Sequence, residues 1–379
     1  METEQHIMVV AGTRPEVLKL APVVSALRGL GLAVTVVATG QHSQILEGAF
    51  QDIGLQPDVR IDVLRPGQPL PALVARILNG VGALLASRPC RAVVVQGDTA
   101  SAFGGALAAF LVGVPVFHVE AGLRTNRMDE PFPEEAFRQM LARIATCHFA
   151  PTQRAADALV AEGVVPAAIH VTGNTIVDTL QQRSVPAVPH DATLVEVPWD
   201  ARRVVFLTAH RRENHGPHLH TILNQAVESL DEFPELAFVI TSHPNPAVQD
   251  ALATVRAAVP RFPGRLFVVD PLSYSDVLLA LSRCWLVATD SGGLQEEAPS
   301  FGKLVLVLRA ATERLEGVDA GVARLAGPNL LEGIRAVRSG SFAWPAGVTN
   351  PYGDGRAGQR ISRTIGAHLG VVPSTLQGA

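Results

Sequence analysis

Cysteine is scarce in this sequence: there are three in 379 residues, and they lie far apart. Cys90, Cys147 and Cys284 form no C-x-x-C pair, which excludes a disulfide framework and a cysteine-based zinc site. We therefore expect buried thiols in a reduced cytosol, and no bound metal.

Long apolar runs and an excess of positive charge are also lacking. No apolar stretch is expected to be long enough to span a bilayer. The N-terminal METEQHIMVV is acidic and only briefly apolar, so we expect a first strand and not a signal peptide. Lys and Arg total 31 against 35 Asp and Glu, a formal net charge of -4, which argues against the basic surface of a nucleic-acid-binding protein. We expect a soluble, cytoplasmic protein that binds neither nucleic acid nor membrane.

A nicotinamide-type dinucleotide fingerprint is missing as well. Gly80-Val81-Gly82 contains half of such a motif, but it lies in a helical pattern and no strand is expected before it. The sequence therefore predicts no redox cofactor, and we expect no other cofactor.

Buried-strand sequence, in contrast, is abundant. At 379 residues and 47% hydrophobic residues, the chain exceeds what one core usually serves, and two domains are expected. Short Val-, Ile- and Leu-rich runs alternate with amphipathic stretches of helix length, which is typical of parallel sheets covered on both faces. The expected strands are residues 7–11, 33–38, 92–96, 116–119 and 148–150, then 203–208, 237–241, 266–269, 285–289 and 304–308.

A proline-bearing, weakly periodic stretch over residues 184–202 divides these strands into two sets of five. We predict a doubly wound α/β domain on each side of it. A loop rich in Gly and Pro, residues 340–355, precedes a last helix. Whether that helix packs on the first domain or the second stays open at this level.

The residues that follow the strands are charged or glycine-rich. Open α/β sheets bind ligands at the carboxyl ends of their strands, and two such edges facing each other would form an active site between the domains. The segments read G-T-R-P-E from Gly12, T-G-Q-H from Thr39, G-D-T from Gly97, E-A-G-L-R-T from Glu120, A-H-R-R-E-N from Ala209, S-H-P-N-P from Ser242, D-S-G-G from Asp290 and R-A-A-T-E-R from Arg309.

An anion site is predicted where D-S-G-G opens a helix. Ser291, Gly292 and Gly293 would let a phosphate approach backbone N–H groups at the positive end of this helix. The same letters also form an ordinary strand-to-helix turn with an Asp or Ser cap. Glu297, one turn further, would accept hydrogen bonds from ribose hydroxyls; the alternative is a solvated helix residue. The candidate phosphate contacts from other strand-end loops are Arg14, Lys19 and Arg314.

Three carboxylates are candidates for acid–base chemistry. Asp98 and Glu120 end consecutive strands, which often lie side by side, and Glu134 opens a helix with Arg138 one turn later. The alternatives are a cap on the helix starting at Thr99 for Asp98 and helix-start electrostatics for Glu134. A carboxylate that ends an apolar strand, such as Glu120, needs a partner or a ligand. Clustered carboxylates can have one raised pKa, which suits general acid–base catalysis.

Taken in order, these motifs resemble the non-hydrolysing UDP-N-acetylglucosamine 2-epimerases of bacteria. The resemblance runs from Gly12 to Ile361 and comprises G-T-R-P-E-x-x-K-x-A-P, T-G-Q-H-x-Q-x-L, G-D-T, H-V-E-A-G-L-R-T, P-F-P-E-E-A, T-G-N-T, H-R-R-E-N-x-G, D-S-G-G-x-Q-E-E, T-E-R and N-P-Y-G-D-G. It implies glycosyltransferase-B architecture, with Rossmann-like domains over residues 1–172 plus 360–379 and over 173–359. The C-terminal helix would return to the first domain, and the protein would form a homodimer.

The resemblance also implies a reaction, the inversion of C2 of UDP-N-acetylglucosamine (UDP-GlcNAc). UDP is eliminated from C1 as a proton leaves C2, and it re-adds to the bound 2-acetamidoglucal after a proton reaches the other face. The implied acid–base group is Asp98, Glu120 and Glu134 with Arg138, and His210 contacts the leaving pyrophosphate. The implied UDP-binding positions are Arg14, Lys19, Ser291, Gly292, Gly293, Glu297 and Arg314.

A regulatory site is implied too, at which a second UDP-GlcNAc activates the bacterial enzymes. The matching positions are Gln41, His42, Gln44, Arg65, Gln68, Glu134, Arg211 and His243. Phe137 stands where asparagine is usual in these enzymes. The alternatives are a hydrolysing 2-epimerase that releases N-acetylmannosamine, a 2-epimerase of a UDP-2,3-diacetamido-uronic acid, a glycosyltransferase and a nucleotide-sugar sensor. The regulatory matches and G-D-T favour the non-hydrolysing type, and the set of carboxylates argues against the last two.

Overall fold

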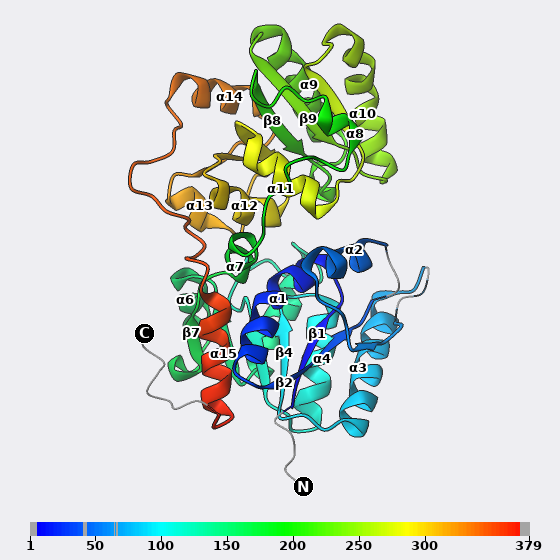
Figure 1. Cartoon of the computed structure of the whole chain (residues 1–379), viewed down its shortest axis with the longest axis vertical. Coiled ribbons are helices and arrows are strands. Elements are labelled where there is room, and N and C mark those ends of the chain that lie inside the picture. Colours follow the sequence, from blue (N-terminus) through cyan, green and yellow to red (C-terminus); the bar gives the residue numbers. More distant parts are fainter. Residues whose placement is uncertain (1–5, 41–43, 64, 66, 372–379) are drawn as a thin grey trace. The chain divides into compact units, whose positions relative to one another are not determined.

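Two compact units make up the chain, and each contains one parallel sheet. The computed structural model describes residues 6–40, 44–63, 65 and 67–371. Unit 1 comprises Met1–Gln182 and Tyr352–Ala379, and unit 2 comprises Arg183–Pro351 (Figure 1). The polypeptide therefore leaves unit 1 after residue 182 and re-enters it at residue 352.

The sheet of unit 1 has seven parallel strands in the order β3-β2-β1-β4-β5-β6-β7. The strands are β1 (His6–Ala11), β2 (Ala33–Ala38), β3 (Val59–Arg60), β4 (Ala92–Gln96), β5 (Val116–Val119), β6 (Cys147–Ala150) and β7 (Ile169–Val171). The winding direction reverses between β1 and β4, and such a reversal is where doubly wound sheets bind ligands.

Both faces of this sheet are buried, as its continuous apolar strands predict. Ile7 and Val9 of β1 join one core cluster, whereas Met8 and Val10 join the other, because successive side chains on a strand point to opposite faces. The first cluster packs on α1 and α2, and the second on α3 and α4. The helices of unit 1 are α1 (Arg14–Gly29), α2 (Gln44–Ile53), α3 (Leu70–Ser87), α4 (Ala100–Leu111), α5 (Glu134–Ile144), α6 (Gln153–Ala161), α7 (Thr175–Gln181) and α15 (Ala357–His368).

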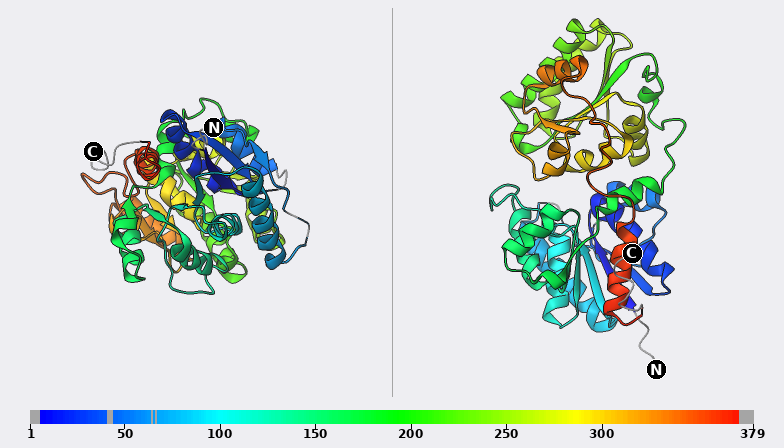
Figure 2. Two further views of the ribbon diagram at one scale, coloured as in Figure 1. Left: turned by 90° about the horizontal axis from the view of Figure 1, so that it is seen from below. Right: turned by 90° about the vertical axis from the view of Figure 1, so that its left-hand side faces the viewer.

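The last helix, α15, belongs to unit 1 and packs against α1 and α7 (Figures 1 and 2). Oδ1 and Oδ2 of Asp178 on α7 accept the first backbone N–H groups of α15, from Gly358 at 2.8 Å and Ala357 at 3.1 Å. Pro22 inside α1 has no N–H for the carbonyl of Leu18, and that carbonyl instead accepts from the Thr179 hydroxyl of α7 at 2.6 Å. The sequence left open whether the last helix packs on the first or the second domain, and the structure places it on the first.

The sheet of unit 2 has six parallel strands in the order β10-β9-β8-β11-β12-β13. The strands are β8 (Arg203–Thr208), β9 (Leu236–Thr241), β10 (Leu266–Val269), β11 (Leu286–Thr289), β12 (Val305–Val307) and β13 (Ala323–Leu325). The helices of unit 2 are α8 (Ala192–Val195), α9 (Pro217–Glu232), α10 (Pro246–Ala258), α11 (Tyr274–Arg283), α12 (Gly292–Glu297), α13 (Leu315–Asp319) and α14 (Leu330–Ser339). One core cluster packs on α9, α10 and α14 and the other on α8, α11 and α12. The winding reverses between β8 and β11.

The ten expected strands are all present, with bounds that agree to within one residue. The sequence prediction missed β3, β7 and β13. Each lies at an edge of its sheet and has two or three residues, too few to show an apolar pattern. The prediction of two doubly wound α/β domains is confirmed.

The bounds of the units differ from those that the resemblance implied. The implied boundaries, 172/173 and 359/360, both fall inside unit 1. The physical reason is the packing of α7 on α1 and α15, together with the hydrogen bond from Asn174 N to Tyr352 O at 2.8 Å. These contacts keep residues 173–182 and 352–359 with the first sheet.

One described helix, α3, has the length and hydropathy of a membrane-spanning segment, although no such stretch was expected from the sequence. Its buried side chains Ile77, Val81 and Leu85 recur every fourth residue and so share one face. That face packs against α4, and Arg76 lies exposed on the helix. This is the pattern of a helix that covers a sheet.

Candidate functional site

The turn after β1 is bonded to the turn after β4 by one buried carboxylate. Glu16 on α1 accepts from Gly12 N at 2.9 Å with Oε2 and from the Thr99 hydroxyl at 2.7 Å with Oε1. Burial raises the pKa of Glu16 to about 6, although these hydrogen bonds oppose the shift. Glu16 thereby fixes the start of α1, where Arg14 is the first residue, against the loop that carries Asp98.

Lys19, a predicted UDP contact, forms an ion pair with Glu120. Gln96 at the end of β4 donates to the same oxygen of Glu120 at 2.9 Å, and both members of the ion pair are buried. Glu120 has a φ of 60°, a conformation that costs energy for a residue with a side chain. Glu120, as a carboxylate at a strand end, requires partners, and these are the ammonium group of Lys19 and the amide of Gln96.

Asp98 is held by Arg138. Nε of Arg138 donates to Oδ2 of Asp98 at 2.6 Å, and Nη1 donates to Glu135 at 3.2 Å. The alternative role of Asp98 as a helix cap is wrong, because the cap of α4 is Thr99, whose hydroxyl accepts from Ser101 N and Ala102 N. Asp98 and Glu120 follow neighbouring strands, so the structure brings these two carboxylates to one edge of the sheet.

Glu134 is the first residue of α5 and is half-buried. Its neighbour Glu135 is fully buried and accepts from Thr125 N at 3.0 Å and Asn126 N at 3.2 Å. Burial alone would raise the pKa of Glu135, but these hydrogen bonds and Arg138 outweigh it and leave that pKa below its usual range. Phe137, the atypical residue of this motif, stacks on Phe103 of α4 with ring centroids 4.7 Å apart, so it serves helix packing.

In unit 2 the turn after β8 is bonded to the turn after β11. Oδ2 of Asp290 accepts from His210 N at 2.8 Å, Arg211 N at 2.8 Å and Asn214 Nδ2 at 2.9 Å. The His210 ring, 38% exposed, stacks on His243 with centroids 5.2 Å apart and planes 7° apart. Burial lowers the pKa of His210; Asp290 opposes this shift, and the His243, Arg211 and His215 charges add to it.

The glycine turn that opens α12 lies against Arg314. A Cβ added to Gly292 would lie 2.7 Å from Cζ of Arg314, whereas one added to Gly293 would meet nothing nearer than 3.9 Å. Ser291 precedes the helix without a side-chain cap, and Glu297 is buried on it, which excludes the solvated alternative. The Arg314 guanidinium is paired with Glu296 at 3.0 Å and with Glu313, so its charge is partly compensated.

The predicted regulatory positions are distributed over both units. Gln41 and His42 lie outside the described residues, and only the backbone of Gln44, the first residue of α2, is described. Gln68 N donates to Arg65 O at 3.2 Å, so these two share a turn; Arg65 also pairs with Asp62 at 2.9 Å. Arg211 and His243 are close to His210 in unit 2.

Two further histidines are buried beneath the edge of the first sheet. His118 Nε2 bonds the carbonyl of Gly97 at 2.7 Å, and its ring lies 6.4 Å from that of His148. Burial and neighbouring positive charges lower the pKa of His118 to about 3 and that of His148 to about 4. Both rings are therefore neutral at physiological pH.

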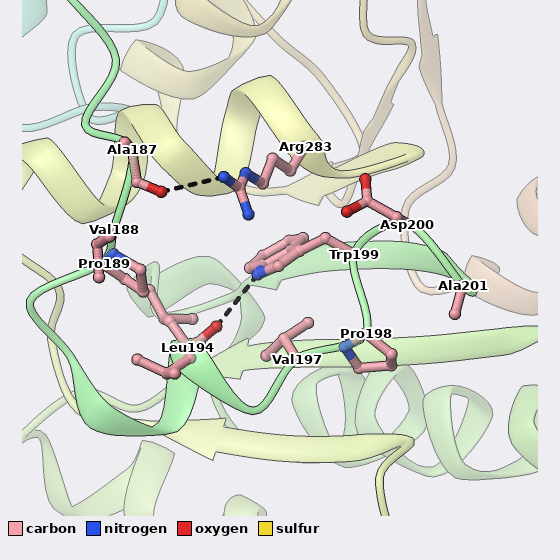
Figure 3. Close-up of a pocket in the computed structure, with 11 residues that line it drawn as sticks. Ala187, Val188, Pro189, Leu194, Val197, Pro198, Trp199, Asp200, Ala201 and Arg283 are labelled. Atoms are coloured by element: carbon pink, nitrogen blue, oxygen red, sulfur yellow. Dashed lines mark hydrogen bonds between the residues drawn. The ribbon is translucent and has the colours of Figure 1, made fainter.

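A cavity of about 430 Å³ lies elsewhere in unit 2 (Figure 3). Trp199 and Arg283 line it and donate to the carbonyls of Leu194 and Ala187, each at 3.1 Å. None of the predicted site residues lines it. Over the described ranges, no group of three or more His, Cys, Asp or Glu side chains could hold a metal ion.

Glu16, Gln96, Glu135 and Asp290 are the site residues that sequence reasoning missed. Glu16 and Glu135 adjoin predicted residues within G-T-R-P-E and P-E-E, and Asp290 heads D-S-G-G. Glu16 and its partner Thr99 are 83 residues apart in the sequence, and Asp290 and its partner Asn214 are 76 residues apart. For Glu16, Glu135 and Asp290 only the motifs could have indicated a role, and for Gln96 only its place at the end of the expected strand 92–96.

Comparison with known proteins gives a consistent result over most of the chain. Residues 26–366 match the family model described as UDP-N-acetylglucosamine 2-epimerase. The UDP-N-acetylglucosamine 2-epimerase of Bacillus subtilis is 38% identical over 373 residues, 96% of each protein. The Neisseria meningitidis UDP-GlcNAc 2-epimerase bound to UDP-GlcNAc superposes with a TM-score of 0.87 at 33% identity, over 95% of this chain and 99% of that one.

An archaeal structure is similar as well. The Methanocaldococcus jannaschii UDP-GlcNAc 2-epimerase in complex with UDP-GlcNAc and UDP has a TM-score of 0.78 at 29% identity, over 95% of this chain and 98% of that chain.

Proposed function

Because this chain belongs to the UDP-N-acetylglucosamine 2-epimerase family, we propose that it interconverts UDP-GlcNAc and UDP-N-acetylmannosamine (UDP-ManNAc) without hydrolysis. The observation that carries the proposal is the pair of carboxylates at one sheet edge. Asp98 and Glu120 follow neighbouring strands and are held by Arg138 and Lys19. Fixed carboxylates at a ligand-binding edge suit proton transfer at one carbon from two faces.

The proposed reaction has two steps. First a carboxylate takes the C2 proton, the C1–O bond breaks, and its electron pair leaves with UDP, which gives 2-acetamidoglucal. A proton then reaches the opposite face of C2, and a UDP oxygen re-forms the bond to C1. No carbonyl adjoins C2, so its proton becomes acidic only as positive charge grows at C1. Groups that stabilise the departing pyrophosphate therefore contribute directly to the rate.

We assign the nucleotide to two groups of residues. Ser291, Gly292 and Gly293 would present backbone N–H groups to phosphate, Glu297 would accept from the ribose, and His210 would contact the pyrophosphate. Arg14 and Arg314 would add positive charge. Lys19 is paired with Glu120, which supports a role for its charge in keeping that carboxylate in place as well as in binding UDP.

The decisive test is incubation with UDP-GlcNAc in D₂O, followed by NMR. The proposal predicts UDP-ManNAc that carries deuterium at C2 and an intact link to UDP. Free N-acetylmannosamine would identify a hydrolysing enzyme. Absence of deuterium at C2 in the presence of turnover would overturn the elimination mechanism.

We further propose that UDP-GlcNAc is also an activator, bound at Gln41, His42, Gln44, Arg65, Gln68, Glu134, Arg211 and His243. The stacking of His243 on His210 supports a link between that site and the pyrophosphate contact. Pure UDP-ManNAc should then react slowly until UDP-GlcNAc accumulates or is added. Immediate conversion at full rate, without a lag, would contradict activation.

A homodimer is proposed on the same family grounds. Phe110, Leu111 and Val112 at the end of α4 are 51%, 65% and 56% exposed, and an exposed apolar run of this kind supports a protein contact. Sedimentation velocity should show a dimer, and the double variant F110E/L111E should shift it toward monomer. A monomeric wild type would contradict the homodimer proposal and would leave the proposed reaction unaffected.

A further inference from the structure

Asp290 is a fully buried carboxylate beside the partly exposed His210 of unit 2. It follows β11, whose neighbour β8 ends two residues before His210. The hydroxyls of Thr208 and Thr289 bond each other across these strands at 2.6 Å. Asp290 thus emerges at the reversal point of the second sheet, on a backbone that neighbouring strands hold in place.

The two oxygens of Asp290 have different surroundings. Oδ2 accepts three hydrogen bonds from the loop after β8, two from the backbone of His210 and Arg211 and one from Asn214. Oδ1 is buried and has no hydrogen-bond partner in the described part of the chain. Its neighbour is Nδ1 of His210, at 3.8 Å. A buried carboxylate oxygen without a donor is costly, and a small rotation of the His210 ring would bring Nδ1–H within hydrogen-bonding distance.

The other groups around His210 oppose its protonation. His243 after β9 stacks on the ring, and Arg211 and His215 flank it in the same loop, where His215 Nε2 bonds the His210 carbonyl at 3.1 Å. Burial and these three neighbours lower the pKa of His210, and the Asp290 charge raises it. Asp290 is therefore placed to stabilise a positive imidazolium at this position.

We infer that Asp290 is a positioning residue that holds Nδ1–H of His210 and so directs Nε2 of the imidazole, in its protonated form, toward the UDP pyrophosphate. The inference rests on the proposed function for the identity of the anion. The two ring nitrogens lie on opposite sides of the imidazole, so a ring anchored through Nδ1 presents Nε2 away from Asp290. Nε2–H then donates a hydrogen bond to the oxygen on which charge develops. In this role His210 transfers no proton to Asp290 or to the pyrophosphate.

The first test needs only the wild-type protein. ¹⁵N NMR of the imidazoles, with the His210 signals assigned from a His210→Gln variant, reports which ring nitrogen carries the proton. We expect neutral His210 to be protonated at Nδ1. A neutral His210 protonated at Nε2 would overturn the inference, whatever the activity of the enzyme.

The second test is Asp290→Asn. The amide oxygen can still accept from the three loop donors, whereas the NH₂ group would face Nδ1 of His210. We expect the neutral ring to change to the Nε2–H form and the NMR-detected titration of His210 to move to lower pH. The kcat should fall about 10- to 100-fold at pH 8, more than KM changes, and part of the loss should be recovered at lower pH.

The matched control is Asp276→Asn. Asp276 is also a buried carboxylate of unit 2, and it accepts from His190 N at 2.7 Å and Ser273 Oγ at 2.9 Å, but it belongs to α11. The Asp276→Asn substitution should leave the tautomer of His210 and the pH profile of the enzyme unchanged. An equal change in both variants would mean a general structural effect and overturn the inference. If the wild type does not epimerise UDP-GlcNAc, the proposed function fails while the NMR result still decides the His210–Asp290 relationship.

Discussion

Arg138 on α5 donates a hydrogen bond from Nε to Oδ2 of Asp98, and the two atoms are 2.6 Å apart. This bond connects the helix that opens with Glu134 to the loop after β4. Since Nη1 of Arg138 also bonds the buried Glu135, the guanidinium is held from two sides. Asp98 is thereby fixed by a side chain 40 residues away.

Asp98→Asn tests the proposed acid–base group. The amide oxygen can still accept from Arg138, but the group can no longer take a proton. We expect deuterium exchange at C2 to fall about 10²- to 10⁴-fold, while calorimetry shows UDP binding retained. Asp157→Asn, exposed on α6, is the control. Unchanged exchange in Asp98→Asn would remove Asp98 from the group.

Glu16→Gln tests the buried carboxylate between the first two loops. The folded-state pKa of Glu16, about 6, lies above the ordinary value of 4.5 for a glutamate. Its contribution to stability is therefore complete below pH 4.5 and is lost as pH rises through about 6, at a cost of about 2 kcal/mol. The Gln variant should lack this loss in urea unfolding measured from pH 4 to 8. Asp157→Asn should retain it, and an unchanged slope in Glu16→Gln would refute the assignment.

The burial of His118 and His148 predicts the opposite dependence of stability on pH. Their folded-state pKa values, about 3 and about 4, lie below the ordinary value of 6.5 for a histidine. The unfolded chain binds protons that the folded chain does not, so stability is lost as pH falls below 6.5, by up to about 1.4 kcal/mol per pH unit for each residue. His118→Gln and His148→Gln should each reduce the steepness of acid unfolding. The exposed His218→Gln should not, and identical curves for all variants would contradict the prediction.

Gly292→Ala and Gly293→Ala form a matched pair at the start of α12. The new methyl at 292 would lie 2.7 Å from Arg314 Cζ and displace a guanidinium paired with Glu296, whereas at 293 the nearest atom is 3.9 Å away. We expect Gly292→Ala to lower the free energy of unfolding of unit 2 by about 1–3 kcal/mol. Gly293→Ala should change it by less than about 1 kcal/mol. Equal effects in urea unfolding would show that Arg314 does not require this glycine.

Much of the fold could be predicted because strand sequence is local information. A run such as residues 204–207 is apolar at consecutive positions, and only a strand covered on both faces buries all of it. The edge strands β3, β7 and β13 were missed because two or three residues carry no such pattern. The returning α15 could be expected only from the resemblance, since its contacts with α1 join residues more than 300 positions apart in the sequence.

For the site, the sequence by itself determined which chemical groups are present and that they follow strands. Asp98 and Glu120 in the first sheet, and His210 and the D-S-G-G turn in the second, could be identified as candidates in this way, because the carboxyl ends of the parallel strands of each sheet meet at one edge of that sheet. The tertiary structure alone decided the partners: Lys19 pairs with Glu120, Arg138 holds Asp98, and Asp290 faces His210. Hydrogen bonds and ion pairs depend on distances of a few ångströms between residues far apart in the chain, and only the packed sheets and helices determine those distances.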